Sequence, residues 1–245
     1  MAKEKKLKRV LLLLILGLAS QGYAFERIKV FGTVDYLLPG NIEDSLDDAD
    51  DIILDDIGVN EIPIFEGRDA QGAVGGRICL LVPSKKFEGF AWGGSVGFLD
   101  GPSAQTKAVG AGTRYDWTKF SMDNSYLRLL LEGSQEYRLS DNVRTAFGFG
   151  VGIAKAKSEQ EFTGESGFPT KTGFTTEYSS SKTGLTFEVS PAVNIKVKRA
   201  DISLGIRYIY LPRIAGSSDR SDFFIKLPPY EVDDSGFGFF ASVGF

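Results

Sequence analysis

The sequence contains no histidine and only one cysteine among its 245 residues. Without an imidazole, the chain cannot form a Ser-His-Asp or Cys-His arrangement, a histidine general base, or the usual histidine-containing zinc and iron sites. One thiol, Cys79, excludes an intramolecular disulfide and a CxxC pair, and is most simply a small packing residue. We therefore expect no enzyme, no catalytic residue, no cofactor and no defined metal site.

Long apolar runs are also scarce, and the longest one lies at the N-terminus. Residues 3–9 include four lysines and one arginine, residues 10–19 are apolar, and Gly22-Tyr23-Ala24 supplies the small residues of a cleavage site before Phe25. Ser20 and Gln21 end the apolar run well short of the 18 or so residues that a transmembrane helix needs. The pattern predicts a secretory signal peptide over residues 1–24 and export of the protein.

Excess positive charge is absent from the rest of the chain. The whole sequence has 28 basic and 32 acidic residues, and the signal segment holds five of the basic residues and one of the acidic ones. The mature chain therefore carries a net charge of −8. Nucleic acid is not expected as a partner, because phosphate binding needs clustered positive charge.

The dominant pattern after residue 25 is an alternation with a period of two, which indicates β-strands. Along 143–154, one face carries Val, Thr, Phe, Phe, Val and Ile, and the other carries Arg, Ala, Gly, Gly, Gly and Ala. The segments 87–99 and 234–245 alternate in the same way. A soluble half-buried strand would place Lys, Glu, Thr or Gln opposite its apolar face. Small residues are needed instead inside a narrow closed barrel whose apolar face contacts lipid.

Eight such strands are expected, with connections that alternate in length. The predicted strands are 25–38, 69–82, 87–99, 121–138, 143–155, 182–197, 202–212 and 234–245. Polar turns lie at 83–86, 139–142 and 198–201, whereas long external loops are expected at 39–68, 100–120, 156–181 and 213–233. Short periplasmic turns, long external loops and an even strand number are typical of outer-membrane barrels. The sequence therefore predicts an all-β fold, an eight-stranded antiparallel up-and-down transmembrane β-barrel, as one domain over 25–245.

The hairpin Tyr137-Arg138-Leu139-Ser140-Asp141-Asn142-Val143, the following Phe147-Gly148-Phe149-Gly150-Val151-Gly152 run and the terminal alternation through Phe239 to Phe245 resemble a known family. It is the eight-stranded bacterial outer-membrane β-barrel family, with OmpA- and OmpX-type transmembrane domains. The resemblance implies residence in the outer membrane and contact with its lipid and lipopolysaccharide. It also implies a monomer, and an assembly signal at Phe239 and Phe245 for the barrel-insertion machinery.

Charged residues on the small faces are predicted to point into the lumen. They are Arg27, Lys29, Asp35, Arg77, Arg128, Glu132, Glu136, Arg144, Glu188, Lys196 and Arg207. Because lone buried charges are costly, we expect a paired network of Lys29, Asp35, Arg128, Glu132, Arg144, Glu188 and Arg207. Such a network closes the lumen as a plug, and a narrow ion or solute path is the alternative. Candidate pairs join Arg128, Arg144 and Arg207 to Glu132 and Glu188.

Two further features concern the predicted loops. Eight carboxylates crowd residues 43–56, without the spacing of a calcium-binding loop, so a solvated acidic loop is favoured over a Ca²⁺ or Mg²⁺ site. The apolar segments 62–65 and 223–230 are interpreted as strand extension and loop packing.

The sequence predicts a structural or surface-interaction role through the external loops, with an unknown extracellular ligand. A narrow pore is the first alternative, and a soluble exported β-barrel that binds a small apolar ligand is the second.

Overall fold

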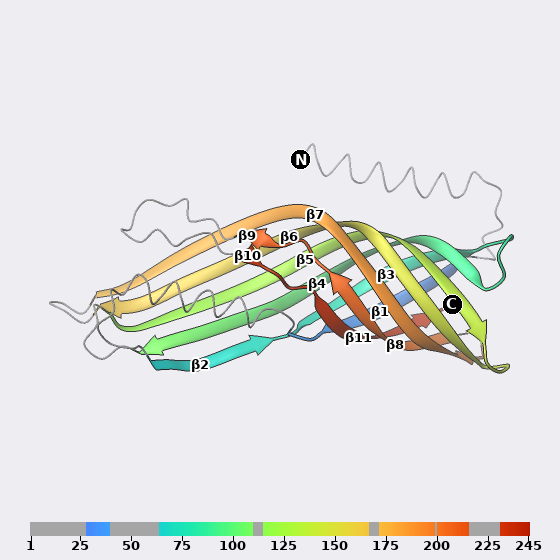
Figure 1. The fold of residues 1–245 in the computed structure, drawn as a ribbon, viewed down its shortest axis with the longest axis horizontal. Helices are drawn as coiled ribbons and strands as arrows, with labels where there is room; N and C mark the ends of the chain where they lie inside the picture. The colour runs from blue at the N-terminus through green and yellow to red at the C-terminus, as the bar shows by residue number, and fades with distance from the viewer. Residues whose placement is uncertain (1–27, 40–63, 110–114, 167–171, 199, 216–230) are drawn as a thin grey trace.

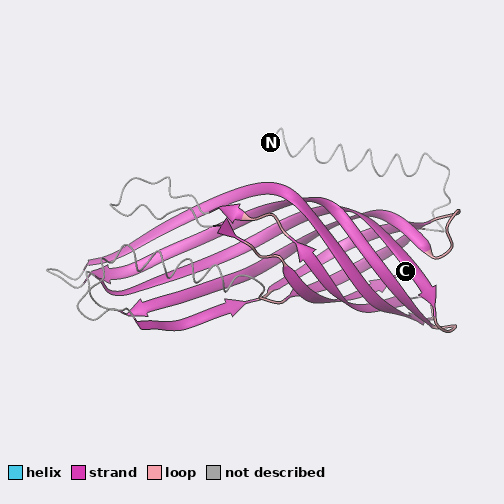
Figure 2. Cartoon of the chain, viewed as in Figure 1, coloured by secondary structure: helices cyan, strands magenta, loops and turns pink. Residues whose placement is uncertain are grey.

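The computed structural model describes residues 28–39, 64–109, 115–166, 172–198, 200–215 and 231–245. The regular structure of these segments is β-strand throughout (Figure 2). No helix in the described part is long and apolar enough to cross a membrane. The strands are β1 (Lys29–Leu37), β2 (Ile64–Gln71), β3 (Ala73–Pro83), β4 (Phe90–Val109), β5 (Tyr115–Arg138), β6 (Val143–Ser166), β7 (Thr172–Val197), β8 (Ala200–Tyr210), β9 (Ile214–Ala215), β10 (Glu231–Val232) and β11 (Gly236–Gly244).

Eight of these strands close into an antiparallel barrel (Figure 1). Neighbours pair in the circular order β1, β3, β4, β5, β6, β7, β8 and β11, and β11 returns to β1. β2 and β3 are separated in the chain only by Gly72, and both pair with β4. β3 pairs with the part of β4 inside the barrel, and β2 pairs with the outer part. The predicted eight-stranded antiparallel barrel is confirmed.

The expected orientation of the strand faces is also confirmed. On β6, Phe147, Phe149, Val151 and Ile153 are about half exposed on the outer surface. On β11, Phe237 and Phe239 point outward with 61% and 54% of their surface exposed. The glycines and alanines between these residues therefore face the lumen.

Small lumen residues make room for two inward aromatic rings. Phe240 points inward, and a Cβ atom at Gly205 would lie 2.6 Å from its ring. A Cβ atom at Gly244 would likewise lie 2.3 Å from the ring of Phe31. Both distances are far below van der Waals contact, so any side chain at these glycines would displace a ring. The glycine-rich inner face is thus a packing requirement of a narrow barrel.

The tight turns lie together at one end of the barrel. The turn between β5 and β6 occupies 139–142, as predicted, and the one between β7 and β8 is centred on Lys198, which has a φ of 55°. The first turn differs from the prediction, because it runs to Gly89 and β4 begins only at Phe90. Its cause is local: the Ser84 hydroxyl accepts the backbone N–H groups of Lys86 and Phe87, and Gly89 has a φ of 74°.

At the opposite end, β4 to β7, together with β2, continue well past the other strands (Figure 1). β4 runs to Val109 and β5 starts at Tyr115, so most of the expected loop 100–120 is strand. The expected loop 156–181 is likewise shortened to the connection between Ser166 and Thr172. These segments differ from the prediction because a strand outside the membrane has a polar outer face and so lacks the apolar alternation of a membrane strand. The remaining parts of the two other loops, 40–63 and 216–230, lie outside the described residues.

The connection between β8 and β11 folds over the outer end of the lumen. Leu211 and Ile214 are at most 1% exposed and join a buried apolar cluster with Leu37, Leu99, Tyr126 and Ile209, among others. The Asp234 carboxylate, also 1% exposed, accepts hydrogen bonds from Tyr126 and from the Asn124 amide at 2.7 Å. We call residues 211–215 and 231–235 the cap. Together with this cluster, the cap fills the outer end of the lumen.

Candidate functional site in the lumen

Glu188 lies at the centre of a buried charge cluster halfway along the barrel. Projecting from β7, its carboxylate forms ion pairs with Arg77 of β3, with Arg128 of β5 at 3.0 Å, and with Arg207 of β8 at 3.6 Å. Strands on opposite sides of the barrel therefore meet at one carboxylate. The side chains of Glu188, Arg128 and Arg207 are each no more than 2% exposed.

Two further carboxylates balance the three arginines. Asp35 of β1 pairs with Arg207, and its second oxygen lies 3.6 Å from Arg128. Glu132 of β5 accepts a hydrogen bond from Arg77 at 2.7 Å. It also accepts the Ser95 hydroxyl and, at 3.2 Å, the Cys79 thiol. We call Asp35, Arg77, Arg128, Glu132, Glu188 and Arg207 the central cluster, which holds three positive and three negative groups.

Burial makes this pairing obligatory. Moving a charge out of water costs several kcal/mol, and the cost is offset only by close partners of opposite sign. Each member of the central cluster has at least one such partner. In addition, the Arg207 guanidinium lies 4.2 Å from the centre of the Phe240 ring, an attractive cation–π contact. The central cluster thus fills the middle of the lumen, next to the cap.

A second group of charges lies nearer the turns. Glu136 accepts a hydrogen bond from Arg144 at 2.9 Å and one from the Asn194 amide at 3.1 Å, and lies 3.7 Å from Lys29. Lys29 is also 3.4 Å from Asp201. The four charged side chains are partly exposed, whereas Asn194 is buried. We call Lys29, Glu136, Arg144, Asn194 and Asp201 the rim.

The predicted network residues thus fall into two groups rather than one. Asp35, Arg128, Glu132, Glu188 and Arg207 lie in the central cluster, whereas Lys29 and Arg144 lie on the rim. Among the candidate pairs, Arg128 and Arg207 do contact Glu188. Glu132 instead pairs with Arg77, and Arg144 with Glu136. Strand register decides these partners, and register is not legible in the sequence.

Several residues of the lumen were missing from the predicted site. Arg77 was expected to point inward but was not assigned a partner, and it bridges Glu132 and Glu188. Ser95 and Phe240 also contact the cluster. Their inward position follows from the alternation of their strands, but their role depends on which strands face each other across the lumen.

A chamber of about 280 Å³ opens between the rim and the central cluster. Its inner end is lined by four residues of the central cluster, Arg77, Glu132, Glu188 and Arg207. Its other end lies at the tight turns and is lined by Pro83, Ser84 and Gly89. Residues of the cap do not line the chamber. The chamber is therefore reached from the side of the turns and stops at the central cluster.

Metal ligands do not gather in the described part of the chain: it holds no group of three or more Cys, Asp or Glu side chains placed to bind an ion. The acidic segment 43–56 lies outside the described residues, and its cation binding stays untested. The central cluster offers carboxylates, but arginines already occupy them.

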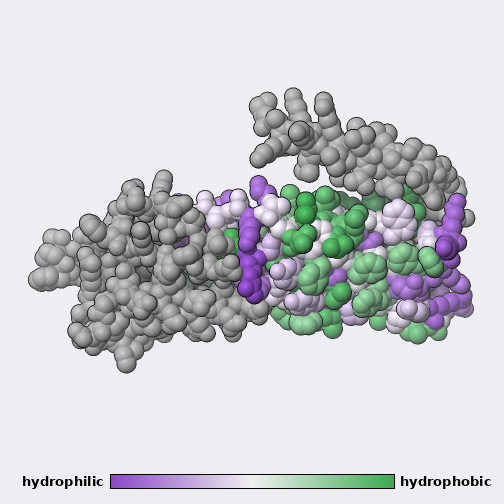
Figure 3. Space-filling view, turned by 45° about the horizontal axis from the view of Figure 1, so that its top comes forward, coloured by the Kyte–Doolittle hydropathy of each residue, from purple (hydrophilic) through white to green (hydrophobic). Residues whose placement is uncertain are grey.

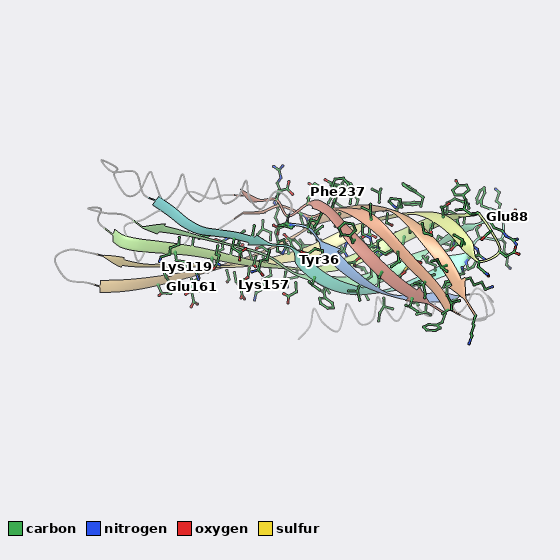
Figure 4. The ribbon with its side chains drawn as sticks, turned by 90° about the horizontal axis from the view of Figure 1, so that it is seen from below. Tyr36, Glu88, Lys119, Lys157, Glu161 and Phe237 are labelled. Atoms are coloured by element: carbon green, nitrogen blue, oxygen red, sulfur yellow. The ribbon has the colours of Figure 1, made fainter. Side chains whose placement is uncertain are left out.

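The face of the barrel seen in Figure 3 is apolar in a belt, and exposed apolar residues on all eight barrel strands continue this belt around the barrel. Hydrophilic residues flank this belt on both sides, near the turns and where the extension begins. In Figure 4, Glu88 marks the turn end, Tyr36 and Phe237 lie farther along the barrel, and Lys119, Lys157 and Glu161 mark the extension. The belt includes Leu131, Leu185, Val34 and Ile78, which are 59–71% exposed. Phe245 is 78% exposed at the end of the outward aromatic row of β11.

A closed barrel satisfies all backbone hydrogen bonds between its strands, and an apolar belt matches the hydrocarbon layer of a bilayer. The fold and surface together define a transmembrane β-barrel of the bacterial outer-membrane class, in contact with membrane lipid. A water-soluble barrel with an apolar interior, the second alternative from the sequence, does not fit this surface.

Comparisons with known proteins return structures rather than sequence relatives. No protein-family model matches the chain, and no curated protein matches it in sequence. The fold is similar to that of Neisserial surface protein A (NspA), with 10% identity, a TM-score of 0.37, and coverage of 89% of this chain and 94% of that one. It is also similar to Ail, the attachment invasion locus protein of Yersinia pestis, crystallised with the heparin analogue sucrose octasulfate. There the identity is 13%, the TM-score 0.30, and the coverage 89% of this chain and 94% of that one.

Proposed function

We propose that the protein is a closed, non-catalytic barrel that holds a β-sheet platform outside the cell and acts by surface interaction through it. The platform is the part of β2, β4, β5, β6 and β7 beyond the apolar belt. The proposal includes export by the signal segment 1–24 and assembly by the insertion machinery. It also places lipopolysaccharide around the barrel.

The length of the strands is the observation that supports the proposal most. A transmembrane strand needs about 9–11 residues, whereas β6 has 24 and β7 has 26. On β6 the outward apolar residues end at Ile153, and Lys155, Lys157, Glu159 and Glu161 follow on the same face. The 12 residues from Lys155 to Ser166 extend for roughly 40 Å along the strand at about 3.4 Å each. Membrane insertion alone does not require this extension.

The outer face of the platform carries an acidic patch that supports a binding role. Asp123 lies directly opposite Glu159, and Glu161 lies directly opposite Glu177. All four residues are exposed. Like charges at directly opposed positions destabilise a sheet, so their presence costs stability. A positively charged extracellular partner fits this patch, which we call the acidic patch.

The closed lumen supports surface interaction over transport. The central cluster is charge-balanced and almost fully buried, and the cap covers the outer end. Both layers would have to move to open a continuous path.

Two variants test the platform. One shortens it by joining β4 to β5 and β6 to β7 with tight turns just beyond Leu127 and Ile153. The other keeps its length but carries D123N, E159Q, E161Q and E177Q. Cells that display each variant are compared with wild type for adhesion to animal-cell monolayers and to immobilised extracellular-matrix proteins. Envelope integrity and heat-modifiable gel mobility are measured in parallel.

We expect both variants to fold and leave the envelope intact, and both to lose adhesion. A matched control neutralises lysines on the same face, with K119Q and K157Q, and should retain adhesion. Adhesion equal to wild type in both platform variants would overturn the proposed role. Loss of envelope integrity with adhesion unchanged would point instead to a purely structural role.

A further inference from the structure

Four hydroxyl groups face the chamber without a protein partner. Thr33, Ser190, Ser203 and Ser242 are each only 6–7% exposed and all line the chamber. Within the described ranges, none of these hydroxyls hydrogen-bonds to another protein group. Buried hydroxyls normally find partners, so the contents of the chamber must supply them.

Strand register sets three of these hydroxyls in one row. Thr33 of β1 lies opposite Ser242 of β11, and Ser242 lies opposite Ser203 of β8. Asn194 of β7 continues the row opposite Ser203. The Asn194 amide donates to Glu136, but its carbonyl oxygen is buried without a partner. Four neighbouring strands thus present a continuous arc of hydrogen-bonding groups.

Two aromatic rings flank this arc. Phe31 precedes Thr33 by two residues on the inward face of β1, and Phe240 precedes Ser242 by two on the inward face of β11. Because the strands are antiparallel, the rings lie on opposite sides of the arc along the barrel. The glycines opposite them, Gly244 and Gly205, leave the rings their space. The arc therefore has apolar surface above and below it.

The chemistry of the wall selects the class of ligand. Hydroxyls both donate and accept hydrogen bonds, so the arc suits a solute that does the same. At each end of the chamber, the charged side chains form ion pairs among themselves. A charged solute would have to compete with these ion pairs. An apolar solute would leave four hydroxyls unpaired. At about 30 Å³ per water molecule, 280 Å³ limits the solute to a small one.

We propose that the chamber is a binding site for a small neutral polyhydroxylated solute, from the size of glycerol to that of a hexose, entering from the periplasm. The hydroxyls of Thr33, Ser190, Ser203 and Ser242 and the Asn194 carbonyl oxygen bind its hydroxyl groups. Phe31 and Phe240 contact its C–H faces. The site lies across the membrane from the platform and does not depend on the proposed surface role.

Saturation-transfer NMR on the full mature protein tests this site. The protein is refolded in an amine-oxide detergent, because sugar-headed detergents would compete, and is titrated with glycerol, ribose and glucose. S203A and S242A each remove one hydroxyl of the arc without adding bulk. S158A is the matched control, because Ser158 is a fully buried serine outside the chamber.

We expect at least one of the three probes to give transfer signals and to saturate. Each arc variant should weaken the affinity roughly threefold or more, as expected for the loss of one hydrogen bond, whereas S158A should leave it unchanged. Heat-modifiable gel mobility identifies any variant that has not folded. If no probe binds, or the arc variants bind as wild type does, the chamber holds water only and the proposal is wrong. Tighter binding of gluconate or glucosamine than of glucose would overturn the preference for a neutral solute.

Discussion

Glu188 is the residue on which the closure of the lumen depends most. Three arginines from three strands contact its carboxylate, and no other acid of the central cluster has as many cationic partners. Removing it would leave buried positive charge without compensation. By contrast, Glu159 on the platform forms an exposed ion pair with Lys157, which contributes little in water.

We predict that Glu188→Ala lowers the free energy of unfolding by about 3–5 kcal/mol, the usual cost of removing one partner from a buried ion pair. Glu159→Ala should change it by less than about 1 kcal/mol. Urea titrations of both variants in lipid vesicles measure the difference. Equal destabilisation of the two would show that the central cluster does not hold the barrel together.

Asp234 gives the cap a dependence on pH. It lies in the connection between β10 and β11, outside the membrane-spanning strands, and burial raises its pKa from 3.8 to about 6. Hydrogen bonds from Tyr126 and Asn124 act in the opposite direction, and the neighbouring Asp233 adds to the increase. Because the folded pKa is the higher one, the folded state binds the proton more tightly between about pH 4 and pH 6. Stability from this group is therefore present at low pH and is lost as pH rises through 6.

Comparison with Asp234→Asn isolates this effect, because asparagine keeps an acceptor for Tyr126 and does not ionise. From pH 4 to pH 7, the stability of wild type relative to this variant should fall by about 2 kcal/mol, which is most of the effect of a pKa raised by about two units. Urea midpoints at pH 4, 5, 6 and 7 measure the trend. A difference that is constant or rises with pH would contradict the assigned burial of Asp234.

At the scale of the strands, the alternation of residues predicted the faces correctly but not the strand ends. Phe147 to Ile153 were expected outside and Gly148 to Gly152 inside, and the structure has them so. The pattern was legible because lipid requires apolar residues on alternate positions. Beyond Ile153 the outer face turns polar, so the same strand continues with Lys155 and Lys157 and no longer looks like a membrane strand. Inside the lumen, the sequence placed Arg77, Glu132 and Glu188 on the inward face, but their pairing could be read only through the register. Lys196, also expected inside, is exposed near the end of β7, and Arg27 lies outside the described residues.

The strand faces can be tested at Val151, which is 53% exposed in the belt. An arginine there would lie in the hydrocarbon, so Val151→Arg should cost about 2–4 kcal/mol. Val151→Leu keeps the position apolar and should be tolerated. Unfolding titrations in vesicles compare the two, and a harmless arginine would require the opposite assignment of faces for β6. On the inner face, a Cβ atom at Gly150 would lie 3.0 Å from Glu188 Cγ, so Gly150→Ser should cause a moderate loss of stability in the same titrations.

At the scale of the whole molecule, two layers of side chains close the lumen of the barrel. In the described part of the chain, the lumen is open only on the side of the turns. The cap and its apolar cluster fill the outer end, the central cluster fills the middle, and the chamber opens toward the turns. The protein therefore combines a sealed lumen with a platform on one side of the membrane and a small hydroxyl-lined chamber on the other. A charged plug was predicted, but neither the cap nor the chamber was, because both depend on contacts between strands that are distant in the sequence.

Channel recording in planar bilayers tests the sealed lumen most directly. The purified wild-type protein is inserted and held at both polarities at neutral pH, with Glu188→Ala and Glu159→Ala as companions. We predict no steady conductance for wild type or Glu159→Ala, and discrete openings for Glu188→Ala, because loss of the central carboxylate loosens the cluster. Large, steady wild-type conductance that Glu188→Ala leaves unchanged would contradict the closed barrel and establish a pore.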